Sequence, residues 1–267
     1  MNRKEAEALK VFREELDMAK GNIFHLRYGP LDLYIEKMSN EIRIRWMTSN
    51  DWMDSSFHYQ FPFQGVFPEN MLSEKRFAYS GEKPKLMVLP CLGEKAFVAR
   101  PDNTFMVLPG EKAKVYLSTP VNVRLTDLDG NRVIDEIPVI HRTQTWFGDS
   151  PTYGQLCFFT NIKAALNEEH LPFRPHRAMT HVIVENRSKK PIPIERLKIP
   201  VNYLTLYQDD RGLFVTSSLS VKCDEKGKVR DVKIIPPENN HKELYKIHEP
   251  REVMSRLLFQ TVTELMR

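Results

Sequence analysis

Residues 141–154 combine more chemically capable side chains than any other stretch of this chain. Two glycines, Gly148 and Gly154, would let the backbone approach a ligand closely, because glycine adopts angles that other residues avoid. Aromatic rings in the same stretch could stack on a sugar or on another ring. The candidate ligand-binding residues of this segment are His141, Trp146, Asp149 and Tyr153.

The same segment also fits a purely structural connection. Gly-Asp-Ser-Pro at residues 148–151 is a strong turn sequence, and Trp146 and Phe147 would then anchor the turn in the core. The segment has neither the Gly-Lys-Ser/Thr of a phosphate-binding P-loop nor the Gly-x-Ser-x-Gly of a nucleophile elbow. We favour the structural interpretation over the ligand-binding one.

Two basic loops are further candidates for binding. Arg174 and Arg177 lie in a proline-containing loop, and Lys189-Lys190 lies in a later turn. Guanidinium and ammonium groups bind phosphates and carboxylates, so these loops could hold a phosphate or an acidic segment of a partner. A solvated loop without a ligand is the favoured alternative. Arg174 and Arg177 complete the set of candidate ligand-binding residues.

Metal and nucleophile chemistry find little support in the sequence. His170, His176 and His181 are spaced by six and five residues, which matches no common zinc motif. Cys157 lies inside an apolar run, where a thiol is usually a small buried hydrophobe, and a pairing with His141 rests on nothing in the spacing. We therefore predict no catalytic residue, no metal site and no cofactor.

Composition indicates an ordinary soluble globular protein. The chain has 267 residues, of which 41% are hydrophobic and 28% charged, with a net charge of +4. This small excess of positive charge is weak for a nucleic-acid binder, although it permits an anionic partner. The three cysteines are far apart, residues 1–20 lack the apolar core of a secretory signal, and no apolar run approaches the ~20 residues of a membrane span. We expect a cytoplasmic protein with reduced thiols.

The patterning predicts a mainly-β fold with a helix at each end. Ala6, Leu9, Phe12 and Leu16 recur at helical spacing, and a second apolar stripe runs to the C-terminus. Between them, residues 31–35 and 42–46 alternate around Ser39-Asn40 as a β-hairpin does. Further short strands are separated by turn residues, which is typical of sandwiches and barrels.

We predict two β-sandwich-like lobes between the terminal helices. The predicted segments are an N-terminal helix at 1–24, lobes at 25–145 and 146–240, and a C-terminal helix at 241–267. Pro-Val-Asn occurs at 120–122 and again at 200–202, each time before an apolar run and a turn. This repeat raises the hypothesis that one lobe is a duplicate of the other.

The stretch from Trp146 to Phe158 resembles an uncharacterised prokaryotic family, number four hundred and thirty-two of the domain-of-unknown-function series. The Pro-Gly-Glu turn at 109–111 and the strand at 182–186 are similar to that family as well. The resemblance covers most of the chain. It implies no assigned chemistry and therefore no catalytic residue.

The favoured function is a non-catalytic binding or adaptor protein, because no coherent set of acid, base and nucleophile is present. A protein partner or self-association fits better than a nucleic acid, and a small anionic ligand is compatible with the basic loops. One alternative is an enzyme or small-molecule binder that uses the 146–154 loop. A weaker alternative is a carbohydrate-binding module built on Trp146 or on the aromatic residues of Asp51–Tyr79.

Overall fold

The computed structural model describes Phe12, 15–16, Met18, 22–69, Met71, 73–79, 85–101, 104–127, 132–148, 154–237 and 243–253. The structure is mainly β, with 56% strand, which confirms the predicted class. The chain divides into two compact units. The first draws on Met1–Cys91, Val121–His141 and Arg174–His176, and the second on Leu92–Pro120, Arg142–Phe173 and Arg177–Arg267. The contiguous lobes at 25–145 and 146–240 stay a prediction.

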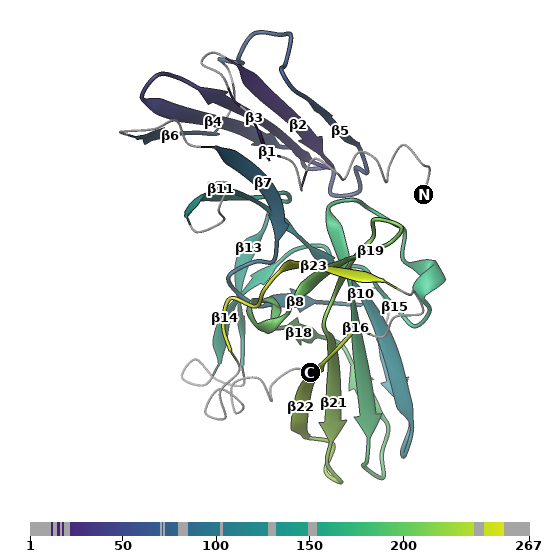
Figure 1. Cartoon of the computed structure of the whole chain (residues 1–267). Helices are drawn as coiled ribbons and strands as arrows, with labels where there is room; N and C mark the ends of the chain where they lie inside the picture. The colour runs from purple at the N-terminus through teal and green to yellow at the C-terminus, as the bar shows by residue number, and fades with distance from the viewer. Residues whose placement is uncertain are drawn as a thin grey trace. The chain divides into compact units, whose positions relative to one another are not determined.

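The first unit contains two antiparallel sheets (Figure 1). One sheet has the order β5 (Phe57–Gln60), β2 (Ile23–Tyr28), β3 (Leu31–Lys37), β4 (Glu41–Thr48) and β6 (Ser73–Ala78). The other has the order β1 (Glu15–Leu16), β7 (Leu86–Cys91), β11 (Asn122–Asp127) and β12 (Val133–Pro138).

Alternation explains the hairpin that the sequence predicted. In β3 the residues Leu31, Leu33 and Ile35 are fully buried, whereas the polar residues between them are partly exposed. A period of two places one set on each face of a strand, so the apolar set faces the core. The pairing of β3 with β4 confirms the predicted hairpin. Strands β5 and β6 lie between residues 51 and 84, where the residue pattern predicted no strand.

The described residues of the second unit form three sheets. The largest has the path β15 (Ala164–Ala165), β10 (Lys112–Pro120), β16 (Arg177–Asn186), β20 (Phe214–Thr216), β19 (Leu206–Asp209) and β23 (Leu244–His248). Beyond β20, strand β21 (Ser218–Cys223) also pairs with β16, and β22 (Val229–Ile235) pairs with β21. A second sheet has the order β13 (Thr143–Phe147), β14 (Gln155–Phe159), β8 (Phe97–Ala99) and β18 (Leu197–Ile199). The third is a two-stranded ribbon of β9 (Phe105–Val107) and β17 (Ile192–Ile194).

The helices predicted at the two ends are wrong. Among the described residues no helix reaches seven residues. Residues 15–16 pair with β7 as β1, and residues 244–248 pair with β19 as β23. The apolar spacing correctly indicated that Leu16 is buried. The backbone hydrogen bonds of this segment, however, are made with the edge of a neighbouring strand and not within a helix. The remainder of both segments, 1–11 and 254–267, lies outside the described residues.

The repeated Pro-Val-Asn takes two different conformations. Pro120 ends β10 and Asn122 begins β11, whereas Val201–Tyr203 form a short 3-10 helix. Both asparagines are buried. The duplication stays a prediction. Among the described residues no helical segment has the length and hydropathy that crossing a bilayer requires.

Candidate functional site

The predicted residues of the 141–154 segment are divided between the two units. His141 belongs to the first unit, is exposed, and its Nε2 lies 2.8 Å from the carbonyl oxygen of Thr48. Trp146 belongs to the second unit, in β13, and is 43% exposed, whereas its neighbour Phe147 is fully buried. The core-anchor interpretation is therefore right for Phe147 and wrong for Trp146. Asp149 and Tyr153 lie outside the described residues.

Arg174 and Arg177 are buried rather than solvated, so the favoured interpretation of that loop is wrong. Arg174, in the first unit, is 3% exposed; its guanidinium lies 5.2 Å from the Trp52 ring and its NH2 donates to Met53 Sδ at 2.7 Å. Burial lowers the pKa of Arg174, against the opposing effect of Asp51. Arg177, in the second unit, is 4% exposed and donates from NH1 to the carbonyl oxygen of Ser118 at 3.0 Å.

The histidines of the proposed zinc hypothesis do not gather. His176 belongs to the first unit, and His170 and His181 belong to the second. Within the described part of the chain, no group of three or more His, Cys, Asp and Glu side chains is arranged to hold a metal ion.

The Lys189-Lys190 turn forms one wall of a hollow in the second unit. The turn follows β16, and its shape depends on Asn186, which is fully buried. The Asn186 side-chain amide donates at 2.8 Å to the carbonyl oxygens of Val107 and Lys190, and its Oδ1 accepts from the Ser188 N–H at 2.8 Å. The Ser188 hydroxyl donates to the Lys190 carbonyl oxygen at 2.7 Å. These bonds fix the backbone that carries the two lysines.

A second turn, between β21 and β22, forms the facing wall. Asp224 Oδ1 accepts the backbone N–H groups of Lys226 and Lys228, each at 2.9 Å. Gly227 has a φ of 78°, in the left-handed region that favours glycine. A hydrogen bond from Arg230 is the main cause of the lowered pKa of Asp224, so this carboxylate stays ionised and keeps the turn closed.

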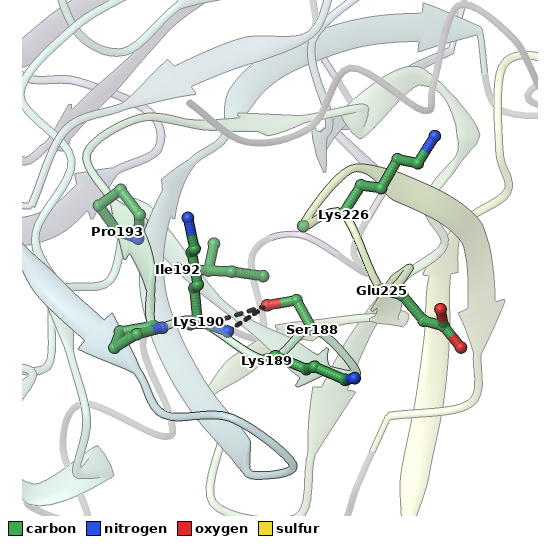
Figure 2. Close-up of a pocket in the computed structure, with 9 residues that line it drawn as sticks. Ser188, Lys189, Lys190, Ile192, Pro193, Glu225 and Lys226 are labelled. Carbon is green, nitrogen blue, oxygen red and sulfur yellow. Dashed lines mark hydrogen bonds between the residues drawn. The ribbon is translucent and has the colours of Figure 1, made fainter.

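The two turns meet because the strands before them are parallel neighbours. In the parallel pairing of β16 with β21, Asn186 lies opposite Cys223, so both strands end at the same edge of the sheet (Figure 1). There Gly227 lies close to Ile192. A Cβ atom on Gly227 would be 3.7 Å from the side chain of Ile192. The resulting hollow (Figure 2) has a volume of about 390 Å³. It is lined by Ser188, Lys189, Lys190, Pro191, Ile192, Pro193, Glu225, Lys226 and Gly227.

The hollow carries an excess of positive charge. Lys189, Lys190 and Lys226 are exposed, and in the described part of the chain none of the three forms an ion pair. Nearby acids are engaged elsewhere, since Glu185 binds Arg187 at 2.6 Å and Asp224 binds Arg230 at 2.7 Å. Glu225 is the one carboxylate in the lining, and in Figure 2 its side chain extends away from Lys190 and Lys226.

Sequence reasoning missed part of this hollow. Lys189-Lys190 was recognised as a basic turn, but Lys226 was not connected with it, because the two segments are far apart in sequence. The Asp-Glu-Lys-Gly turn at 224–227 was the available signal, since aspartate and glycine at these positions are typical of a tight hairpin turn. Only the parallel pairing of the preceding strands, however, brings the turns together.

Sequence reasoning also missed a polar cluster on the outer face of the five-stranded sheet. His25 Nε2 lies 2.6 Å from Asp32 Oδ1, and Arg27 binds Asp54 at 2.8 Å. The His25 ring stacks on Tyr34 at 4.3 Å between centroids. Tyr28 pairs with Leu31 across a two-residue turn. This register places Tyr34 opposite His25 and Asp32 opposite Arg27, on one face of the sheet.

Comparison with known proteins gives a family but no activity. The family model described as "Protein of unknown function (DUF432)" matches residues 14–267, which confirms the resemblance seen in the sequence. No curated protein and no solved structure matches the chain.

Proposed function

The chain belongs to the DUF432 family of proteins of unknown function, and we propose that it is a non-catalytic binding protein that recognises an anionic group in the hollow of Lys189, Lys190 and Lys226. The observation that carries the proposal is the absence of ion pairs at these three lysines, among the described residues, on turns that side-chain-to-backbone hydrogen bonds hold in place. Each ammonium group offers three donors and no acceptor, so it suits carboxylates and phosphates. A preformed arrangement reduces the entropy lost on binding.

The chemistry of the hollow supports binding rather than catalysis. Ser188 is the one hydroxyl among the lining residues, and it is held between two backbone groups: it donates to the Lys190 carbonyl oxygen and accepts from the Lys190 N–H at 3.2 Å. No general base is among the lining residues except Glu225, which extends away from Lys190 and Lys226 (Figure 2). A nucleophile needs an adjacent base, so this set does not favour a covalent mechanism.

The cysteines support the same proposal and a cytoplasmic location. Cys91, Cys157 and Cys223 are free and buried. Burial raises the pKa of Cys157, and burial together with Asp224 raises the pKa of Cys223 to about 11. Both thiols are then protonated at neutral pH and are poor nucleophiles. Buried reduced thiols are typical of a reducing compartment, which supports the proposed cytoplasmic location.

Charge reversal at the three lysines tests the proposed function. The probes are sodium tripolyphosphate, followed by calorimetry, and fluorescein-labelled hexaglutamate, followed by fluorescence anisotropy. We expect the wild-type protein to bind at least one probe, more weakly as ionic strength rises, and the variant Lys189→Glu/Lys190→Glu/Lys226→Glu to bind it about tenfold or more weakly.

A matched triple variant controls for net charge. Lys75→Glu/Lys85→Glu/Lys246→Glu changes the net charge equally, at lysines that already pair with Asp135, Glu15 and Glu249. This variant is expected to bind the probes like the wild type. Equal loss in both variants, or no binding by the wild type, would reject the proposed site.

The 43% exposure of Trp146 favours a second candidate, the carbohydrate- or small-molecule-binding alternative. Trp146 lies opposite Leu156, which is 40% exposed, so the two form a partly apolar surface on the β13–β14 hairpin. A sugar ring stacked there would change the indole fluorescence. Titration with a panel of disaccharides tests this candidate. A response that survives in Trp146→Ala would come from Trp46 or Trp52 and would reject it.

A further inference from the structure

An apolar strip lies beside the lysine hollow, on the ribbon of β9 and β17. Met106 and Leu108 are 52% and 58% exposed, and Pro193 lies directly opposite Met106. Residues directly opposite each other in an antiparallel pair share one face of the sheet. The other face of the ribbon is buried, as Val107 at 2% and Ile194 at 0% exposure show. The outward face is thus apolar but faces solvent.

The apolar strip and the lysines share one wall. Pro191, Ile192 and Pro193 line the hollow, and Pro193 belongs at the same time to the outward face of the ribbon (Figure 2). Asn186 ties the two parts together, because its amide bonds the carbonyl oxygen of Val107 in β9 and that of Lys190 in the turn. The charged and the apolar surface therefore form one continuous, internally bonded structure.

We infer that the occupant is an extended segment of a partner protein, with acidic side chains at the lysines and apolar side chains on Met106, Leu108 and Pro193. This inference rests on the proposed function, because it assigns the anionic group to a polypeptide. At ~3.3 Å per residue, a segment of about six to eight residues spans a hollow of this size and the adjoining ribbon. Methionine adapts its shape to different apolar side chains, which suits a peptide-binding surface.

Other anionic partners fit the surface less well. Small anions would use the lysines and leave the apolar strip uncovered. Single-stranded nucleic acids bind by stacking their bases on aromatic rings, and none of the lining residues of the hollow is aromatic. Binding to an anionic membrane would require lysines on a protruding surface, whereas these three lysines line a concavity. Charge complementarity together with the aliphatic strip favours an acidic and apolar peptide.

Synthetic peptides test the inference. The first is a labelled twelve-residue peptide with three acidic residues followed by alternating leucine and serine, made in both sequence orders. In the second the acids are replaced by their amides, and in the third the leucines by serine. Tripolyphosphate, an unlabelled single-stranded oligonucleotide and vesicles of phosphatidylcholine with phosphatidylserine serve as the remaining probes. We expect the first peptide to bind, in one order at least, about tenfold or more tightly than the second and the third.

Variants of the strip separate the inference from the proposed function. Met106→Ser/Leu108→Ser removes exposed side chains, so the fold is expected to persist. Its matched control is Val133→Ser/Leu166→Ser, at residues that are 47% and 56% exposed elsewhere. The strip variant is expected to bind the first peptide about tenfold or more weakly and tripolyphosphate equally well, and the control variant to bind both like the wild type.

The possible failures differ in what they reject. If lysine reversal weakens tripolyphosphate binding but the strip variant keeps full affinity for the first peptide, only the inference is rejected. The same holds if the oligonucleotide or the vesicles bind and the peptides do not. If neither peptide nor tripolyphosphate depends on the three lysines, both the inference and the proposed function are rejected.

Discussion

Two charged regions of this protein are organised in opposite ways. On the outer face of the five-stranded sheet, His25, Asp32, Arg27 and Asp54 form a chain of contacts in which each group has a partner, at distances from 2.6 to 3.9 Å. At the end of the β16–β21 pair, Lys189, Lys190 and Lys226 carry their charge on hydrogen-bonded turns, without an ion pair in the described part of the chain. Both regions are built on β-hairpins and turns, so the difference lies in the side chains.

The comparison distinguishes charges that are paired within the fold from charges that we propose bind a partner. Paired and partly buried groups contribute to stability, and removing one member leaves the other with an uncompensated desolvation cost. Exposed, unpaired lysines contribute almost nothing to stability and slightly repel each other. We therefore propose that a site whose turns are held by side-chain-to-backbone hydrogen bonds, and whose lysines form no ion pair among the described residues, serves ligand recognition rather than folding.

The largest expected effect comes from the scaffold of the lysine hollow. Asn186→Ala leaves the carbonyl oxygens of Val107 and Lys190 and the N–H of Ser188 without their partner, in a fully buried position. We expect a loss of about 3 kcal/mol in the free energy of unfolding, measured by urea denaturation. Asn167→Ala is the matched control, because Asn167 caps only the exposed Glu168–His170 turn, and it should cost about 1 kcal/mol or less. A small effect at Asn186 would mean that the turns are not rigid.

The paired cluster should show energetic coupling. A double-mutant cycle of His25→Gln and Asp32→Asn is expected to give about 1 kcal/mol, since the two side chains are 11% and 22% exposed. The same cycle on Lys246 and Glu249, an exposed pair at 2.7 Å, should give a coupling that cannot be distinguished from zero. No coupling between His25 and Asp32 would remove the contrast between the two regions.

Neutralising the unpaired lysines should leave stability nearly unchanged. For Lys189→Ala/Lys190→Ala/Lys226→Ala we expect a change within about 0.5 kcal/mol, toward greater stability if any, because mutual repulsion is relieved. Urea denaturation beside the tripolyphosphate titration measures both properties on one sample. A clear destabilisation would assign the lysines to the fold instead of to a ligand.

The smallest expected effect is the pH dependence that arises from His58. Partial desolvation in the fold, with a further contribution from neighbouring His25, lowers the pKa of His58 below its ordinary value, although the side chain is exposed. The unfolded chain then binds the proton more readily, so this contribution to stability is complete above the ordinary histidine pKa and is lost as the pH falls toward the lowered folded value. His58→Gln should flatten this part of the stability profile, and His170→Gln, at an exposed residue of the second unit that lies far from His25 in sequence, should not. A stability profile unchanged in His58→Gln would show that the environment of His58 does not penalise its protonation.

The alternating strands and the turns were readable from the sequence because they depend on local patterns. The hairpin of β3 and β4 shows this, since its alternation and its Ser39-Asn40 turn are both local. The terminal strands were not readable from the sequence, because residues 15–16 and 244–248 are strands only through hydrogen bonds with β7 and β19, which are distant in the chain. Spacing marked Leu16 for burial without specifying its backbone partner.

The sequence by itself determined the mainly-β class, the family and the basic character of the Lys189-Lys190 turn. The tertiary structure decided which basic residues are available for binding. Arg174 and Arg177 are buried, whereas Lys226 joins Lys189 and Lys190 because β16 and β21 run parallel with Asn186 opposite Cys223. The exposure of a basic side chain and the approach of two distant turns depend on strand pairing over long sequence separations. The order of residues within one loop does not encode them.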